Sequence, residues 1–309
     1  MRIAVIGAGG VGGYFGARLA AAGNEVTFVA RGGHLEAMRR SGLVVHSPLG
    51  ELRTSPDSVV ASISELGPTD LVLVAVKLWD TEAVAEELRT SAAHGVPVLS
   101  LQNGVHKDDV LRARLTDEQV LGGVCFISAF IEEPGVVRHN GPLQKVVLGP
   151  YRSGSPETGR AVLAAFRDAG IDAEGSDDIE RSIWEKFVFL VGLSATTATV
   201  RQPVGVVRAN ERSRRLLYEV MAETVAVAQA SGVRLDSGFA EDRLAFCDTL
   251  PAAMTSSMHN DLEKGNRLEL PWLSGGVVDL ADRLDVPVPR NRTVADILAP
   301  YVLGRPAGS

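Results

Sequence analysis

The chain has 309 residues, of which 45% are hydrophobic and 22% are charged, enough for a substantial core and, as a soft prior, for two domains. Its formal net charge of −7 argues against a surface that binds nucleic acid or anionic lipid, so we expect any bound anion to be small. Cys125 and Cys247 have no CxxC spacing and no histidine cluster nearby, which predicts neither disulfides nor a metal site and favours the reducing cytoplasm. The first apolar stretch is too short and too rich in glycine to span a membrane, and no basic leader precedes it, so secretion is not expected.

The first half of the chain alternates β-rich runs with amphipathic runs, which predicts βαβ units in a mostly parallel sheet. The β-rich runs are almost continuously Val, Ile and Leu, as strands buried on both faces require. Strands are expected at residues 2–6, 25–31, 70–77 and 96–104, and helices at 12–23 and 81–95. Residues 43–54 are expected to form a hairpin or another excursion from this pattern.

A second β-rich portion, residues 124–130 and 135–151, is expected to continue the sheet, followed by a helix at 155–170 and a strand-like segment at 171–178. From Ile179 onward the pattern is mainly helical, at residues 179–193, 212–232, 239–250, 271–285 and 292–303. The sequence therefore predicts an α/β fold, with an N-terminal doubly wound sheet domain over residues 1–177 and an all-helical C-terminal domain over residues 178–309.

Residues 7–12 read GAGGVG, a GxGxxG pattern between an expected strand and an expected helix. In this context the first glycine permits a tight turn, the second lets the backbone approach a pyrophosphate, and the third lets helix and strand pack closely. The helix N-terminus then presents unpaired N–H groups to the phosphates. The residues expected to bind a dinucleotide are Gly7, Ala8, Gly9, Gly10, Val11 and Gly12. The alternative is a glycine-rich turn without a ligand.

Arg31 stands at the end of the second expected strand, where a site specific for NAD usually offers an acidic residue. A guanidinium there binds a 2′-phosphate in bidentate fashion, so the sequence favours NADPH over NADH, unless Arg31 is simply a solvated surface residue. Lys77 and Asn103 follow two further expected strands, and ligands of such sheets gather at the carboxyl ends of the strands. Because Asn103 precedes a glycine, its alternative interpretation is a plain turn.

Lys186 lies in the run WEKFVFLVGL, whose apolar residues cover most directions around a helix and so predict burial on nearly all sides. A buried ammonium either loses its proton more readily or recruits a carboxylate, and both outcomes suit a proton donor. The alternative is a lysine whose stem packs on Trp184 while its head stays in water. Glu269, followed by Pro271, is either a site carboxylate or a residue of the first turn of a helix.

Several short motifs occur in order along almost the whole chain: GAGGVG, AVK, QNG, WEK, TSSMHNDL, NRLEL and LDVPVPRN. Together they resemble the ketopantoate reductase family, the 2-dehydropantoate 2-reductases. The resemblance implies an N-terminal Rossmann domain that binds NADPH and a helical domain that closes over the cleft. It also implies reduction of the 2-keto group of ketopantoate to a secondary alcohol.

The resemblance extends to individual positions. Gly7, Gly9 and Gly12 match the glycine motif, and Arg31 matches the arginine associated with the 2′-phosphate. Lys77 and Asn103 match residues of the cofactor and substrate cleft, and Lys186 matches the catalytic lysine, which protonates the alkoxide formed by hydride transfer. Ser257 and Glu269 match residues that contact substrate, with Glu269 also near the cofactor ribose.

The sequence departs from the family one and two helical turns after Lys186. Members that reduce ketopantoate commonly carry asparagines there, whereas this chain has Leu190 and Ser194. Leucine cannot replace the hydrogen bonds of an amide, so we expect either that Ser194, Ser257 and Asn260 hold the substrate differently or that the substrate is a more apolar 2-keto compound.

Three other functions compete with ketopantoate reduction. The first is NADPH-dependent turnover of another 2-keto or 3-hydroxy acid, and the second is a non-catalytic NADPH sensor, which would not need Lys186 and Glu269. The third, a structural dimerisation module, leaves the glycine motif unexplained. Apolar helices of the second domain offer a homodimer interface, although periodicity does not separate an interface from a core face.

Overall fold

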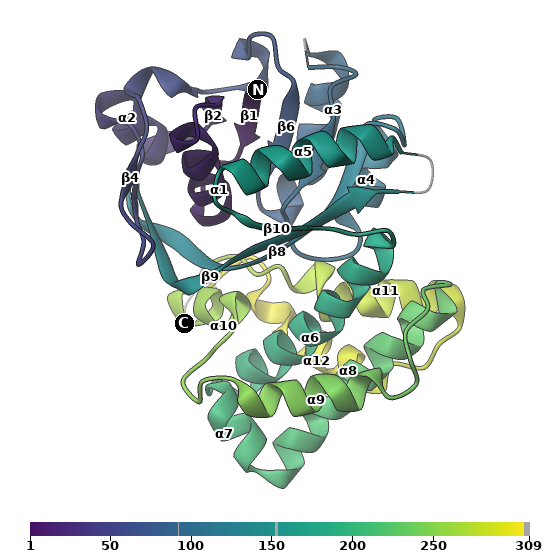
Figure 1. Ribbon diagram of the computed structural model, residues 1–309. Coiled ribbons are helices and arrows are strands. Elements are labelled where there is room, and N and C mark those ends of the chain that lie inside the picture. The colour runs from purple at the N-terminus through teal and green to yellow at the C-terminus, as the bar shows by residue number, and fades with distance from the viewer. Residues whose placement is uncertain (92, 152–153, 306–309) are drawn as a thin grey trace. The chain divides into compact units, whose positions relative to one another are not determined.

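The computed structural model describes residues 1–91, 93–151 and 154–305. The chain divides into two compact units (Figure 1). A sheet unit comprises Met1–Asn103 and Lys107–Ser182, and a helical unit comprises Gly104–His106 and Ile183–Ser309. The predicted fold class, an α/β sheet domain followed by an all-helical domain, is confirmed.

The sheet unit alternates strands and helices, as the sequence predicts. Its elements in chain order are β1 (Arg2–Ile6), α1 (Gly10–Ala21), β2 (Glu25–Val29), α2 (Gly32–Ser41), β3 (Val44–His46), β4 (Leu52–Arg53), η1 (Pro56–Ser58), β5 (Val59–Val60), η2 (Ile63–Glu65), β6 (Leu71–Val74), η3 (Leu78–Asp80), α3 (Thr81–Thr90), β7 (Val98–Ser100), α4 (Lys107–Arg112), β8 (Val120–Glu133), β9 (Val136–Pro150), α5 (Pro156–Asp168) and β10 (Asp172–Gly175). The helices α2 and α4 were not expected from the sequence.

The strands form one sheet in the order β4-β3-β9-β8-β7-β6-β1-β2-β5, with β10 paired to β9. All neighbours from β8 to β5 are parallel, which confirms the predicted mostly parallel sheet. The long strands β8 and β9 pair antiparallel with each other, and β3 and β4 form the antiparallel excursion expected at residues 43–54. The sheet is therefore parallel from β8 through the glycine motif to β5, whereas beyond β8 it is mixed, because β3 and β10 each pair parallel with β9.

Both faces of the parallel part are covered, which explains the continuous apolar character of its strands. In β1, Ile3 and Val5 join a core cluster with residues of α1 and α5, whereas Ala4 and Ile6 join a cluster with residues of α3 and α4. Figure 1 shows α5 lying across one face of this unit. The alternation of neighbouring residues between two cores is the doubly wound arrangement predicted from the sequence.

The helical unit has one apolar core built from all its long helices. Its elements are α6 (Ile179–Val200), α7 (Val204–Ala209), α8 (Glu211–Ala230), α9 (Phe239–Thr249), α10 (Ser257–Lys264), η4 (Leu270–Trp272), α11 (Ser274–Leu284), α12 (Pro289–Leu298) and η5 (Ala299–Tyr301). Among the helices of the described residues, α6 is long and apolar enough to cross a membrane, but 67% of its most apolar window is buried inside the protein. Such burial is that of a core helix in a soluble protein.

Candidate active site

Four neighbouring strands of the sheet unit end at one edge of the sheet and carry the candidate residues there. The strands β7, β6, β1 and β2 are adjacent and parallel, so their carboxyl ends lie side by side. Asn103 follows β7, Lys77 follows β6, the glycine motif follows β1, and Arg31 follows β2. This edge is where sheets of this type bind ligands.

The glycine motif has the backbone geometry that a pyrophosphate requires. Gly7 has a φ of +97°, and a Cβ there would lie 2.8 Å from the Val76 nitrogen. A Cβ on Gly12 would lie 2.1 Å from the Gly7 oxygen, so α1 packs against the turn only because the residue is glycine. A Cβ on Gly9 would meet nothing within 4 Å. The structure thus leaves open space at Gly9, the glycine predicted to let the backbone approach a phosphate.

Gly10 is also constrained by its neighbours, in this case by a strand of the sheet. A Cβ there would lie 2.2 Å from the Ala129 oxygen of β8, so its α-carbon packs against a strand. Ala8 is 1% exposed, which leaves its backbone as the part available to a ligand. The cofactor-binding roles of Ala8, Gly10 and Val11 stay predictions.

His34 of α2 fixes the orientation of the glycine turn. Its Nδ1 accepts a hydrogen bond from the Gly135 N–H at 3.0 Å, so its Nε2 carries the proton and donates to the Ala8 oxygen at 2.8 Å. The Ala8–Gly9 peptide is planar and trans, so holding the Ala8 carbonyl toward His34 directs the Gly9 N–H away from it. Burial lowers the pKa of His34, opposed by the Ala8 contact, which agrees with a neutral imidazole.

Arg31 is the N-terminal flanking residue of α2, and its side chain is 67% exposed. Its Nη1 lies 3.8 Å from Oδ1 of Asp80 in η3. An exposed ion pair at that distance contributes little, about 0–1 kcal/mol, so Arg31 remains able to exchange Asp80 for a phosphate.

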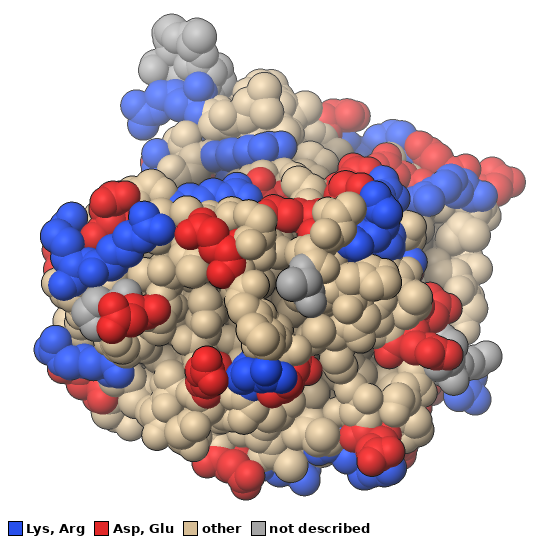
Figure 2. Space-filling view, turned by 90° about the horizontal axis from the view of Figure 1, so that it is seen from above, with Lys and Arg blue, Asp and Glu red and all other residues tan. Residues whose placement is uncertain are grey.

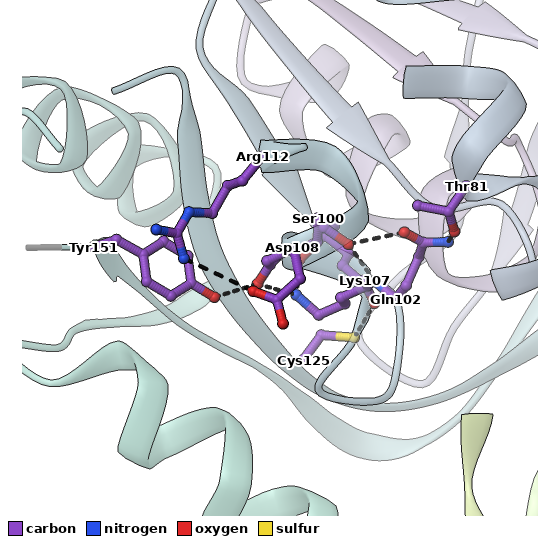
Figure 3. Close-up of polar contacts among 10 residues, drawn as sticks. Thr81, Ser100, Gln102, Lys107, Asp108, Arg112, Cys125 and Tyr151 are labelled. Atoms are coloured by element: carbon purple, nitrogen blue, oxygen red, sulfur yellow. Dashed lines mark hydrogen bonds and ion pairs between the residues drawn. The ribbon is translucent and has the colours of Figure 1, made fainter. Parts of the chain in front are cut away.

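The loops after β6 and β7 are joined by buried side chains (Figure 3). Lys77 is exposed, with its Nζ 5.7 Å from the centroid of the Trp79 ring, and Asn103 is partly buried. Gln102, directly before Asn103, donates from Nε2 to the Val76 oxygen at 3.0 Å, directly before Lys77. The two candidate residues are thus anchored through their chain neighbours.

Lys107 is the most deeply buried lysine of the candidate region, at 2% exposure. Its Nζ donates to Oδ2 of Asp108 at 2.8 Å and to the Ser100 oxygen at 3.4 Å. Tyr151 donates to the same carboxylate oxygen at 2.7 Å, and burial next to Asp108 raises the pKa of Tyr151 far above its ordinary value. Figure 3 shows the side chains of Lys107 and Tyr151 meeting at Asp108.

In the helical unit, α6 carries Lys186, Leu190 and Ser194 at successive turns. Lys186 and Leu190 are partly exposed, whereas Ser194 is 0% exposed and its Oγ has no hydrogen-bond partner among the described residues. The expectation that Lys186 is buried on nearly all sides is wrong, because Glu185, Lys186, Phe189 and Leu190 form a partly exposed strip along the helix. A substrate contact of Ser194 would need its hydroxyl to become accessible, so that role stays a prediction.

The start of α10 is attached to α6 by buried polar groups. Ser256, the N-cap of α10, lies 3.0 Å from Thr197 Oγ1 through its hydroxyl, and His259 donates from Nδ1 to the Thr197 oxygen at 2.8 Å. Ser257 and Asn260 are exposed on the same short helix. Glu269 is partly exposed and flanks η4, with Pro271 in the first turn, which agrees with the helix-start alternative for its position and leaves its site role a prediction.

The described residues contain no group of three or more His, Cys, Asp or Glu side chains placed to hold a metal ion. On the face drawn in Figure 2, basic and acidic side chains are interspersed over the residues that the view describes.

Comparison with known proteins identifies the family. Residues 3–153 match the family model described as "Ketopantoate reductase PanE/ApbA", and residues 178–302 match its C-terminal counterpart. The 2-dehydropantoate 2-reductase of Halobacterium salinarum is 35% identical over 299 residues, covering 96% of this chain and 98% of that protein. A crystal structure of a PanE/ApbA family ketopantoate reductase from Ralstonia eutropha matches with a TM-score of 0.89 at 33% identity, covering 98% of each chain. The chain belongs to the ketopantoate reductase family.

Members of the ketopantoate reductase family are oxidoreductases that act on a CH–OH or C=O group and use NADPH. The fold is shared more widely, since a D-mandelate dehydrogenase solved with NADH and anilino(oxo)acetate matches with a TM-score of 0.89 at 21% identity, covering 98% of each chain. The open space at Gly9, the start of α1 at Gly10 and the exposed Arg31 fit a dinucleotide with a 2′-phosphate.

Three groups of the candidate region were missed from the sequence: His34, Gln102 and the Lys107–Asp108 pair. Gln102 stands in the QNG motif and His34 three residues after Arg31, so proximity to singled-out residues was the available signal. The partners of His34 lie 26 residues away or more, and Gln102 bonds to Val76 and Thr81, which lie 26 and 21 residues away, so no local pattern reveals these contacts.

Proposed function

We propose that this protein reduces ketopantoate to pantoate with NADPH, in the cytoplasm, as a step of pantothenate and coenzyme A biosynthesis. The observation that carries the proposal is the open glycine turn at Gly9, set among the carboxyl ends of β7, β6, β1 and β2 in a chain of the ketopantoate reductase family. The homodimer predicted through the helical unit is part of the same proposal.

The sheet unit holds the cofactor in this proposal. The backbone of Gly7–Gly12 binds the pyrophosphate, and Arg31 binds the 2′-phosphate. Lys77 and Asn103 bind the opposite end of the dinucleotide, and Glu269 contributes to the ribose and to the substrate. NADPH, when bound, supplies the hydride.

Lys186 donates the proton to the alkoxide in this proposal, and its ammonium stabilises the negative charge that develops on oxygen. Its partial exposure supports the assignment, because a proton donor must regain its proton from water after each turnover. Ser257 and Asn260, both exposed on α10, are the proposed substrate contacts, with Ser194 as a further one if its hydroxyl becomes accessible.

A second candidate is the reduction of another 2-keto acid or the oxidation of a 3-hydroxy acid. Leu190 favours it, because a partly exposed leucine one turn after Lys186 offers apolar surface where an amide would hold a hydroxyl. The similarly folded D-mandelate dehydrogenase was solved with NADH and anilino(oxo)acetate, and its likeness to this chain is one of fold.

Steady-state oxidation of NADPH with ketopantoate, followed by nicotinamide absorbance, tests the proposal, with phenylglyoxylate and other 2-keto acids in parallel. A kcat/KM highest for ketopantoate supports it. A higher kcat/KM for an apolar 2-keto acid supports the second candidate. Tight NADPH binding without turnover of any of these acids would instead indicate a cofactor sensor.

Arg31→Ala tests the cofactor assignment. The dissociation constant for NADPH should rise roughly 10- to 100-fold, the equivalent of one strong charge-assisted contact, while that for NADH changes far less. Arg39→Ala, which removes an arginine from the other end of α2, is the matched control. An equal loss for both cofactors would show that Arg31 does not contact the 2′-phosphate.

A further inference from the structure

Gln102 makes a set of hydrogen bonds that no role assigned so far requires. It is 7% exposed, and its side-chain amide uses both donor hydrogens and its oxygen. Nε2 donates to the Val76 oxygen at 3.0 Å and to Thr81 Oγ1 at 2.7 Å, while Oε1 accepts from Ser100 Oγ at 3.0 Å. A flipped amide would set Oε1 against the Val76 carbonyl, so this network determines the orientation.

These bonds reach the residues on both sides of Lys77. Val76 precedes Lys77 and is bonded directly. Thr81 accepts from Gln102 and in turn donates from Oγ1 to the oxygen of Leu78, which follows Lys77, at 2.9 Å. Gln102 itself directly precedes Asn103. One amide therefore links the backbone on either side of Lys77 to the backbone that carries Asn103. Figure 3 shows the Gln102 side chain between Ser100 and Thr81.

Hydrogen bonds also hold the backbone on the amino-terminal side of Gln102. Ser100 Oγ accepts from the Gln102 backbone N–H at 3.3 Å, and the Ser100 oxygen accepts from Lys107 at 3.4 Å. The Leu101 oxygen accepts from the Cys125 thiol of β8 at 3.1 Å. Because the backbone around Gln102 is held in this way, its side chain can hold the Lys77 loop in place rather than shift when that loop moves.

We propose that Gln102 is a positioning residue that sets the distance between Lys77 and Asn103, and through it the geometry of the cofactor end of the site. The inference rests on the proposed function in one respect, the assignment of Lys77 and Asn103 to the cofactor. Its chemistry is that of an orienting amide: Gln102 contacts neither the cofactor nor the substrate. A displacement of a site group by about 1 Å can cost on the order of 10²-fold in rate, so such a link has a measurable effect.

The test uses Gln102→Met, which keeps the approximate volume and removes all the side-chain hydrogen bonds. NADPH affinity is measured directly by fluorescence titration, and kcat and KM are measured with the best keto acid. We expect the NADPH dissociation constant to rise about 10-fold, with kcat falling between about 10- and 100-fold. In a Lys77→Ala background the effect of Gln102→Met on NADPH affinity should shrink to less than about 2-fold, because the group being positioned is gone.

Gln119 offers a matched control in the same unit. It is also 7% exposed, and its Nε2 donates to a backbone carbonyl, that of Val96, but it lies just before the amino end of β8, away from the strand ends that carry the site. Gln119→Met should lower the unfolding temperature about as much as Gln102→Met and leave NADPH affinity unchanged. Thr81→Val removes only the link from Gln102 through Thr81 to Leu78, so it should also raise the NADPH dissociation constant, by a smaller factor than Gln102→Met. It is the variant to use if Gln102→Met does not fold.

Unchanged NADPH affinity in both Gln102→Met and Thr81→Val would overturn the proposal, and so would an undiminished effect in the Lys77→Ala background. Either result would reduce Gln102 to a stabilising core residue. Because the titration needs no substrate, failure of the wild-type protein to reduce ketopantoate would reject the proposed function while leaving this test in place.

Discussion

Two lysines of this chain lie in opposite surroundings. Lys107 in the sheet unit is 2% exposed and bonded to the Asp108 carboxylate and the Ser100 carbonyl, whereas Lys186 in the helical unit sits on a partly exposed strip of α6. A buried ammonium with fixed partners holds structure, because giving up its proton would leave those partners unsatisfied. A partly exposed ammonium can exchange its proton with water. The two lysines therefore differ in the access of their ammonium groups to water, and Lys186 is the one proposed as the proton donor.

Replacing Lys186 is the strongest test of this contrast between the two lysines. Lys186→Ala should lower kcat by roughly 10²- to 10⁴-fold, the usual contribution of a general acid, with little change in NADPH affinity or in the free energy of unfolding. Lys186→Arg keeps a positive charge but is a far weaker acid, so it should lose most of the same activity. Steady-state kinetics and cofactor titration measure both. Unaltered turnover in Lys186→Ala would remove Lys186 from the mechanism.

Removing Lys107 should have the opposite profile. Lys107→Met leaves the Asp108 charge buried with only Tyr151 as donor, and breaking such a buried pair costs about 3–5 kcal/mol of unfolding free energy. Adding Asp108→Asn should recover part of that loss, since the uncompensated charge is then gone. The measurement is urea-induced unfolding.

Lys145 is the matched control for Lys107. Its Nζ lies 2.7 Å from Oε1 of Glu174, but these side chains are 28% and 55% exposed. Lys145→Met should therefore cost at most about 1 kcal/mol. Equal losses for Lys107→Met and Lys145→Met would show that the buried pair has no special structural role.

The same contrast explains which features could be predicted from the sequence. The strands of the sheet unit and the glycine turn follow from local patterns, the continuous apolar runs and the GxGxxG spacing, because both faces of each strand are covered locally by helices. The helix around Lys186 follows from its apolar residues as well. The partial exposure of Lys186 does not follow from the pattern, because the apolar residues Phe189 and Leu190 are partly exposed as well. The spacing of apolar residues does not show which of them lie at the surface.

Local sequence patterns do not predict the burial of Lys107. The run HKDD reads as a solvated polar turn, and the group that completes its network, Tyr151, lies 43 residues after Asp108. The antiparallel pairing of β8 with β9 could not be predicted from local patterns either, because nothing in the short run at residues 124–130 indicates that β8 has 14 residues. Polar networks between loops depend on which loops the fold brings together.

His34 extends the comparison to a partly buried group that is neutral rather than charged. Burial lowers the pKa of His34 below its ordinary value, opposed by the contact with the Ala8 oxygen. Protonation would also place an N–H on Nδ1 opposite the Gly135 N–H, whose hydrogen bond Nδ1 now accepts. A folded-state pKa lower than the unfolded one means that the unfolded chain takes up a proton first as pH falls. The resulting stability is therefore fully present above about pH 6.5 and is lost as pH decreases through the folded pKa.

This effect should be the smallest of those expected here, at most about 1.4 kcal/mol per pH unit for one proton. Unfolding free energies of the wild type and of His34→Gln between pH 7.5 and pH 5 measure it, and the wild type should show the steeper decrease. His94→Gln, at an exposed histidine of the same unit, should leave the wild-type slope unchanged. Identical slopes for the wild type and His34→Gln would mean that the contact of His34 with the glycine turn tolerates protonation, and that the Gly9 N–H is oriented by the backbone of the turn alone.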